Sequence, residues 1–177
     1  MKVILLMTIT LDGRIALDSE HKADWSEKAD KKIFVELTKR AGVIIMGSRT
    51  YDTIGSPLSG RKNIVLTRDK SRASTEANLV FTDQTPAEIV SSLEKEGFEE
   101  AVLIGGQSVN TLFAQVKLID QIVVTISPLV FGRGLSLFDE TISMHLRLQT
   151  LEKLGDNSLI ASYAVLKGKK GLLYSIF

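Results

Sequence analysis

Short apolar runs separated by helical patterns extend along most of this chain. The runs cover residues 3–7, 43–46, 63–67, 79–81, 101–104 and 121–126. Runs of this length are typical of buried strands, and segments between several of them repeat their apolar residues at helical spacing. The alternation of strands and helices predicts an α/β fold.

Two of the intervening helices have signals of their own. The clearer one, residues 86–96, opens on a capping-box pattern of Thr85 and Glu88. The other, residues 108–116, directly follows the pair Gly105-Gly106. Its free backbone N–H groups can therefore face a phosphate or pyrophosphate group.

The pattern changes in the last third of the chain. Leu146, Leu148 and Leu151 stand among polar residues, a mostly apolar run covers residues 159–166, and a Gly-Asp-Asn turn at 155–157 lies between them. This predicts an antiparallel hairpin added to the sheet, without ligand chemistry. We expect one domain over residues 1–167, followed by a basic and then apolar tail at 168–177. The tail could dock on its own domain, join a dimer contact or fray.

One carboxylate stands on an apolar helix face. Over residues 26–40, Ile33, Phe34 and Leu37 recur at helical spacing, and Asp30 lies on the same face, one turn before Phe34. An acid in this position either complements the positive end of the helix or meets a polar ligand in a mostly apolar pocket. In such a pocket, desolvation would let it carry a proton near neutrality.

Composition narrows the possible functions. A chain of 177 residues with 44% hydrophobic residues and a mean hydropathy of +0.13 is long enough for one compact domain. A net charge of +1 gives no broad electrostatic footprint for nucleic acid or an anionic membrane. The absence of cysteine excludes disulfides, iron–sulfur clusters and thiol catalysis. No apolar run approaches the roughly 20 residues of a membrane span, so we expect a cytoplasmic protein.

The two histidines do not predict a metal site. His21 and His145 lie far apart in the sequence, and neither has an acid at metal-ligand spacing. A surface or loop position explains them better. We therefore expect no bound metal.

The centre of the chain carries a specific motif. Trp25, Asp30 and Phe34 are followed by residues 43–51, VIIMGSRTY, and residues 54–68, IGSPLSGRKNIVLTR. This series closely resembles dihydrofolate reductase. The resemblance implies a central, mostly parallel twisted sheet that is flanked by helices and ends in a C-terminal antiparallel hairpin.

Flanking segments extend the resemblance over most of residues 2–167. Residues 10–16, TLDGRIA, resemble the first strand running into the mobile active-site loop of that family. Residues 102–109, VLIGGQSV, resemble the strand and double-glycine turn of that family. Residues 117–125 resemble the strand that ends in its pterin-site threonine.

The resemblance implies NADPH-dependent reduction of 7,8-dihydrofolate to tetrahydrofolate. Asp30 would hold the pterin ring and assist its protonation, and Thr125 would hydrogen-bond to Asp30 directly or through water. Arg61 would bind the glutamate carboxylate of folate, a task that suits its planar fork. Several of the implied apolar contacts are equally explicable as ordinary core. The implied substrate-binding residues are Leu6, Thr8, Asp30, Phe34, Ile54, Leu58, Arg61 and Ile104.

The same resemblance implies a dinucleotide site. Arg49 and Arg68 would supply charge for a 2′-phosphate, which implies NADPH over NADH. Gly105 and Gly106 would permit close approach of the backbone, and in the family this pair is joined by a cis peptide bond. The implied cofactor-binding residues are Thr8, Ile15, Ala16, Gly47, Ser48, Arg49, Thr50, Leu66, Thr67, Arg68, Ile104, Gly105, Gly106, Gln107, Ser108 and Val109.

Two alternatives remain open. Residues 127–134, SPLVFGRG, resemble a segment of the related riboflavin-pathway pyrimidine reductases, which act on 5-amino-6-(5-phosphoribosylamino)uracil. The helix acid and the Pro-Leu-x-Gly-Arg segment favour dihydrofolate over that pyrimidine. Lys31 and Asn110, which replace an apolar and an aromatic residue of the family pattern, point instead to a non-catalytic nucleotide-binding module. A monomer and a homodimer are both compatible with the sequence.

Overall fold

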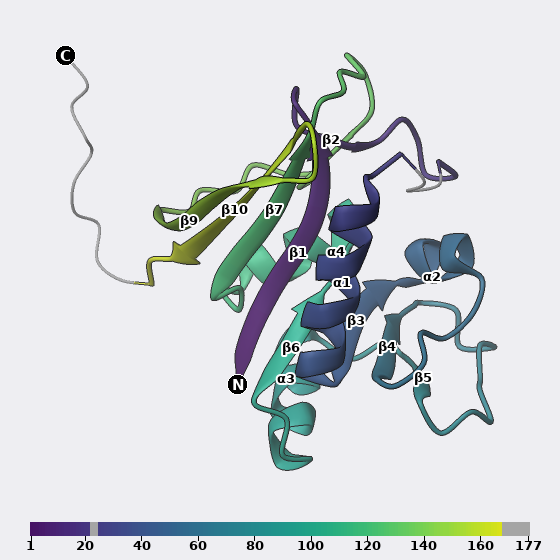
Figure 1. Ribbon diagram of the computed structural model, residues 1–177. Coiled ribbons are helices and arrows are strands. Elements are labelled where there is room, and N and C mark those ends of the chain that lie inside the picture. Colours follow the sequence, from purple (N-terminus) through teal and green to yellow (C-terminus); the bar gives the residue numbers. More distant parts are fainter. Residues whose placement is uncertain (22–24, 168–177) are drawn as a thin grey trace.

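The computed structural model describes residues 1–21 and 25–167, and Figure 1 shows their arrangement around one large sheet. Its strands are β1 (Lys2–Thr10), β3 (Val43–Gly47), β4 (Lys62–Leu66), β5 (Leu79–Thr82), β6 (Glu100–Leu103), β7 (Gln121–Ser127), β9 (Leu146–Leu154) and β10 (Ser158–Val165). They lie in the order β5-β4-β3-β6-β1-β7-β10-β9. All pairings from β5 to β7 are parallel, and β10 is antiparallel to both β7 and β9.

Helices cover both faces of the parallel part. They are α1 (Lys28–Ala41), α2 (Ser48–Ile54), α3 (Pro86–Lys95) and α4 (Gln107–Gln115). Leu5 of β1 belongs to one core cluster with Leu93 of α3 and Phe113 of α4, whereas Ile4 belongs to a second cluster against which Phe34 of α1 packs. Because successive strand residues point to opposite faces, the apolar run of β1 supplies both cores.

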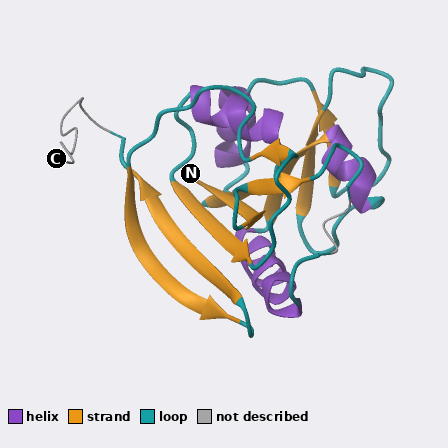
Figure 2. Cartoon of the chain, turned by 90° about the horizontal axis from the view of Figure 1, so that it is seen from above, coloured by secondary structure: helices purple, strands orange, loops and turns teal. Residues whose placement is uncertain are grey.

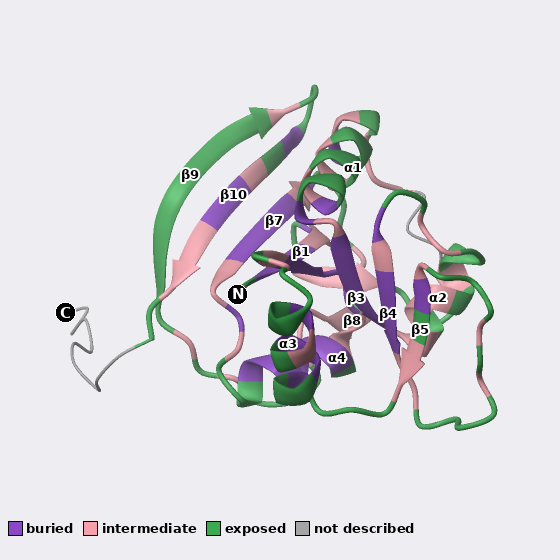
Figure 3. Cartoon of the chain, turned by 90° about the horizontal axis from the view of Figure 1, so that it is seen from below, coloured by how far each residue is buried: buried purple, intermediate pink, exposed green. Residues whose placement is uncertain are grey.

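The C-terminal hairpin extends the sheet beyond these helices. Figure 3 shows β9 as an exposed outer strand, with the more buried β10 lying between β9 and β7. Gly155, with a φ of 60°, stands in the turn between the two strands. Seen from above in Figure 2, the hairpin curves away from the helices at one side of the molecule.

The predicted fold class is confirmed, including the parallel strands and the final hairpin. Two short strands were not predicted, β2 (Arg14–Ala16) and β8 (Leu135–Ser136), which pair with each other in a separate small sheet. The predicted tail at 168–177 lies outside the described residues. Among the helices that the structure describes, none is long and apolar enough to cross a membrane.

Candidate active site

A cleft of about 1150 Å³ opens at the carboxyl ends of the parallel strands. Its floor includes Leu6 and Thr8 from β1, Gly47 from β3, Leu66 from β4 and Ile104 after β6. Open α/β sheets bind their ligands outside the carboxyl ends of the strands, where helices leave to opposite faces. The fold therefore brings most of the implied substrate and cofactor residues to one place.

Asp30 enters this cleft from the first turn of α1. Its side chain is 9% exposed, and the hydroxyl of Thr8 on β1 donates a hydrogen bond to Asp30 Oδ2 at 2.8 Å. Thr125 was expected to reach Asp30 directly or through water, and the direct hydrogen bond is not made. Thr125 is the register neighbour of Thr8, but its buried Oγ1 has no hydrogen-bond partner among the described residues. A contact through water stays a prediction. β1 supplies the direct hydroxyl contact that the resemblance assigned to β7, the next strand of the sheet.

Apolar side chains surround Asp30. Phe34 from the next turn of α1, Ile54 at the end of α2, Leu6 and Ile104 line the cleft, as the resemblance implied. Ile54 is 37% exposed and stands at the rim. Such a wall excludes water from a flat heterocycle while leaving one carboxylate for its polar edge.

Leu58 is not among the residues that line the described cleft. It packs against the second core cluster. The turn that follows α2 directs Leu58 into the protein, where its backbone N–H donates to the Asn63 side chain at 2.9 Å. The expected substrate contact of Leu58 is therefore replaced by core packing.

Arg61 is also placed away from the described cleft wall. Its side chain is 8% exposed, Nε donates to the Ser59 carbonyl at 3.0 Å, and Nη1 donates to the Thr38 hydroxyl. Burial lowers the pKa of its guanidinium group. No carboxylate among the described residues pairs with it. These contacts brace the start of β4 against α1, and the expected grip on a substrate carboxylate has no support in this geometry.

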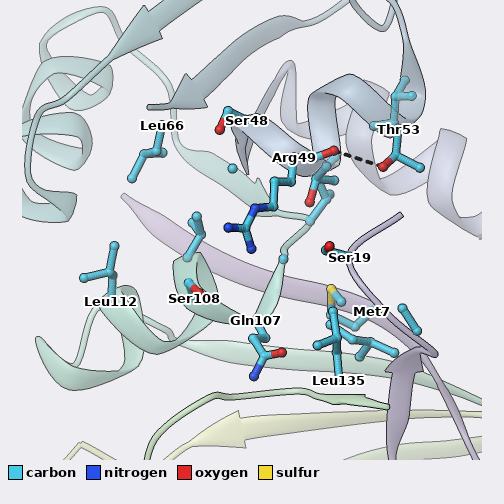
Figure 4. Close-up of a pocket in the computed structure, with 18 of the residues that line it drawn as sticks. Met7, Ser19, Ser48, Arg49, Thr53, Leu66, Gln107, Ser108, Leu112 and Leu135 are labelled. Atoms are coloured by element: carbon cyan, nitrogen blue, oxygen red, sulfur yellow. Dashed lines mark hydrogen bonds between the residues drawn. The ribbon is translucent and has the colours of Figure 1, made fainter. Parts of the chain in front are cut away.

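The opposite wall, which we call the α4 side, consists of residues 47–50, 66–68 and 106–109. Gly106 is the N-cap of α4 and brings no side chain to its first turn, so the free N–H groups of that turn have no side-chain cap. Figure 4 shows the Arg49 side chain extending into the cavity, with Ser108 and Gln107 nearby. Arg68 lines the same wall from the loop after β4.

The peptide bond between Gly105 and Gly106 is cis, as the resemblance implied. Gly105 has a φ of 94° and accepts a hydrogen bond from Gly47 N at 2.8 Å, so the turns after β3 and β6 are in direct contact. A Cβ on Gly47 would lie 3.0 Å from Val109 Cγ2. Larger residues would separate the two turns that form this wall.

The α4 side has the features that a phosphorylated dinucleotide requires. An uncapped helix N-terminus suits a pyrophosphate, and two arginines suit a further phosphate group. Every cofactor-binding residue implied by the resemblance lines this cleft except Gly105, which lies directly behind Gly106. The residues present therefore fit NADPH, whose bound form supplies a hydride.

Sequence reasoning missed many of the polar residues around the cleft. Lys31 follows Asp30 on α1, and the segments 18–21 and 82–86 contribute further side chains. The position of 82–86 directly after β5 could have revealed it, because the carboxyl ends of parallel strands share one edge. The additional lining residues are Met7, Asp18, Ser19, His21, Ser26, Lys31, Thr53, Asp69, Thr82, Asp83, Gln84, Thr85, Pro86, Leu112 and Leu135.

Two anchors hold the loops beside the cleft. The Asp12 carboxylate accepts hydrogen bonds from Phe131 N at 3.1 Å and from the next N–H, and its pKa is lowered chiefly by the Thr10 hydroxyl. The rings of His21 and Trp25 pack against Phe131 at centroid distances of 5.5 and 5.4 Å. The loop after β2 is therefore fixed to the loop after β7.

The second anchor is Glu27, immediately before α1. Its carboxylate accepts hydrogen bonds from the Ser158 hydroxyl at 2.9 Å and from Asp156 N at 3.2 Å. The Ser158 hydroxyl is the largest cause of the lowered pKa of Glu27. The turn of the last hairpin is thereby tied to the end of the helix that bears Asp30.

No group of three or more His, Cys, Asp or Glu side chains in the described part of the chain is placed to hold a metal ion. The chemistry available at the cleft is therefore that of one buried carboxylate, an adjacent lysine and an anion-binding wall. That combination suits binding, hydride transfer and protonation of a small polar ring.

The fold and the cleft define an α/β domain of the dihydrofolate reductase-like class. The chain belongs to the RibD C-terminal domain family, whose model matches residues 1–160. This is a family of oxidoreductases.

Solved structures resemble this fold over nearly the whole chain. A putative riboflavin biosynthesis protein from Shewanella sp. PV-4 matches with a TM-score of 0.78 and 24% identity, covering 94% of this chain and 100% of that one. The deaminase/5-amino-6-(5-phosphoribosylamino)uracil reductase of Thermotoga maritima matches with a TM-score of 0.77 and 18% identity, covering 93% of this chain and 56% of that one.

The curated relatives include an uncharacterized protein and a dihydrofolate reductase. The uncharacterized protein YyaP of Bacillus subtilis is 25% identical over 153 residues, covering 77% of this chain and 80% of its own. The dihydrofolate reductase of Staphylococcus haemolyticus is 29% identical over 112 residues, covering 60% of this chain and 61% of its own. The family match favours the pyrimidine reductase alternative over the expected dihydrofolate substrate.

Proposed function

We propose that this chain is an NADPH-dependent reductase of a phosphorylated ribosylaminopyrimidine, the class of substrate that the name of the Thermotoga maritima protein gives. The observation that carries the proposal is the composition of the α1 side, which we define as Leu6, Thr8, Asp30, Lys31 and Phe34. It offers a proton carrier and a cation within one cleft, opposite a wall that fits the dinucleotide.

Lys31 supports a phosphorylated substrate. It is exposed, lines the cleft one residue after Asp30, and forms no ion pair with the described residues. An ammonium group at the rim attracts a phosphate and would hold it away from the reacting carbon. Arg61, by contrast, is engaged with Ser59 and Thr38 and leaves the folate tail without a partner.

The chain's residues divide the chemistry between the two walls. The ribosylamine opens by breaking its bond from C1′ to the ring oxygen, which leaves a hydroxyl group and an imine between C1′ and the amino nitrogen. Reduction then adds a hydride to C1′ and a proton to that nitrogen, so one proton is consumed. Asp30 stands in the cleft to hold that proton, and Phe34 and Leu6 keep water from the reacting atoms. Arg49 and Arg68 would hold the cofactor's 2′-phosphate on the opposite wall.

The test is NADPH oxidation by the purified protein with 5-amino-6-(5-phosphoribosylamino)uracil. We expect turnover, and we expect Lys31→Ala to raise KM about tenfold through loss of one charge-assisted contact. Lys32→Ala is the matched control, because Lys32 is exposed and does not line the described cleft. Turnover that is equal for the phosphorylated and the dephosphorylated pyrimidine would contradict the role of Lys31.

Dihydrofolate is the second candidate substrate, and one observation favours it. A buried acid beside an aromatic ring can bind the amino group and ring nitrogen of a pterin, and Asp30 and Phe34 have this arrangement. NADPH oxidation with dihydrofolate, measured in the same preparation, separates the two substrates. A kcat/KM more than tenfold higher for dihydrofolate would replace the pyrimidine assignment.

A further inference from the structure

The hydrogen bond between Thr8 and Asp30 joins two elements that are distant in sequence. Thr8 lies in the last part of β1 and Asp30 in the first turn of α1, and both side chains line the cleft. The donor–acceptor distance is 2.8 Å, and the acceptor is Asp30 Oδ2. A neutral hydroxyl has one proton to donate, so this contact commits the Thr8 O–H to one carboxylate oxygen.

The two oxygens of Asp30 are consequently not equivalent. Oδ2 accepts from Thr8, while no described residue donates a hydrogen bond to Oδ1. An oxygen that accepts a short hydrogen bond is a poorer place for a proton than one that does not, because protonation there would force the hydroxyl to turn away. A proton on Asp30 therefore resides on Oδ1.

We propose that Thr8 is a positioning residue that reserves Asp30 Oδ2 and so directs the acidic proton to Oδ1, toward the substrate. The inference deepens the proposed reductase function and rests on it for its kinetic consequence. The hydroxyl also fixes the side-chain rotamer of Asp30, because rotation about the side-chain bonds of Asp30 would break the hydrogen bond to Thr8 on β1.

Other charged groups share this cleft and bear on any pH profile. Thr125, the register neighbour of Thr8 on β7, is polar but neutral, and its buried Oγ1 has no partner among the described residues. The charged and titratable side chains that line the cleft with Asp30 are Asp18, His21, Lys31, Arg49, Arg68, Asp69 and Asp83. Glu27, just before α1, is engaged with Ser158 and Asp156 and keeps its charge to lower pH than an ordinary glutamate because its pKa is lowered.

The experiment compares Thr8→Val, which keeps the branched shape and removes the hydroxyl, with Thr8→Ser, which restores a hydroxyl. In Thr8→Val we expect the maximal rate at low pH to fall about tenfold, because the proton is then shared between both oxygens and the rotamer is free. Thr8→Ser should restore the rate.

A readout without substrate keeps this test independent of the proposed function. The three-bond couplings of the Asp30 side chain, measured by NMR, should report one χ1 rotamer in the wild type and in Thr8→Ser and an average of rotamers in Thr8→Val. Thr150→Val, the same exchange on exposed β9, is the matched control and should leave these couplings and the rate unchanged. Unchanged Asp30 couplings in folded Thr8→Val would overturn the proposal. Absence of wild-type turnover with both substrates, together with averaged couplings in Thr8→Val, would overturn the proposed function and leave the positioning role standing.

Discussion

The α4 side and the α1 side of the cleft are built from different parts of the chain. On the α4 side, backbone turns at Gly47 and Gly105-Gly106 form much of the wall, and the Arg49 side chain extends into the cavity (Figure 4). On the α1 side, the wall consists of side chains whose positions depend on helix rotation and strand register. A backbone wall tolerates little change in shape, whereas a side-chain wall can change its substrate by single substitutions. We therefore expect binding of a dinucleotide as such to be the more resistant property and substrate choice the more easily altered one.

The largest effect is expected at Asp30. Asp30→Asn keeps the size and polarity of the side chain and removes its proton, so turnover should fall by about 10²–10⁴ at neutral pH. NADPH affinity, measured by fluorescence titration, should stay within twofold because the α4 side is unchanged. Near-normal turnover by a folded Asp30→Asn protein would show that the α1 side does not supply the proton through Asp30.

The next effect tests the arginines of the α4 side. Arg68→Ala should weaken NADPH binding about ten- to a hundredfold and spare NADH, since a charged hydrogen bond contributes about 1.5–3 kcal/mol. Titration of both cofactors measures the difference. Arg133→Ala is the control, because Arg133 is exposed and does not line the described cleft. Equal weakening of both cofactors would show that Arg68 supports the loop and not the 2′-phosphate.

A smaller effect is expected at Arg61, to which the resemblance assigned binding of the folate carboxylate. Arg61→Met removes the donor to Ser59 and Thr38. We expect the free energy of unfolding to fall by about 1–2 kcal/mol, which lowers the melting temperature by a few degrees. KM for either substrate should change less than twofold, because Arg61 does not line the described cleft. A tenfold rise in KM that is specific to dihydrofolate would show that Arg61 binds this substrate, and it would favour dihydrofolate over the pyrimidine.

The smallest effect concerns Glu27, which ties α1 to the hairpin. Its pKa is lowered on folding, so its contribution to stability is complete above the ordinary value of 4.5 and is lost as pH falls through the folded pKa. Melting temperatures of wild type and Glu27→Gln should therefore differ at pH 7 and converge as the pH falls below the lowered pKa of Glu27. A difference that persists unchanged at low pH would mean that the Glu27 charge does not hold the hairpin turn.

Sequence reasoning reached the two walls by different routes. The cofactor-binding residues, among them those of the α4 side, came from the family resemblance, and all but Gly105 line the described cleft, where the segments around Gly47 and Gly106 form tight backbone turns. Helix periodicity placed Asp30 on an apolar face and left open a role at the helix end or in a pocket, and the structure buries it in the cleft. The resemblance assigned a hydroxyl contact to Thr125, but a resemblance does not determine which neighbouring side chain donates, and in the structure Thr8 provides the hydroxyl.

The turn after α2 shows the same limit. Leu58 and Arg61 lie in a segment without helical or strand periodicity, so the sequence contained no signal for the direction of their side chains. The structure turns both into the protein, toward the second core cluster and Thr38 respectively. Their motif resembles that of folate enzymes, but a motif alone does not determine what its side chains contact.

The Glu27 anchor has a consequence for how the chain matures on the ribosome. Residues 1–127 contain β1, β3, β4, β6, β7 and α4, together with every residue of the α4 side. The hydrogen-bond donors that secure Glu27 are in residues 156–158 and are synthesised more than a hundred positions after the start of the helix that they hold. The residues of the α4 side therefore emerge first, and the helix end that carries Asp30 gains its attachment to the hairpin only after residues 156–158 have emerged.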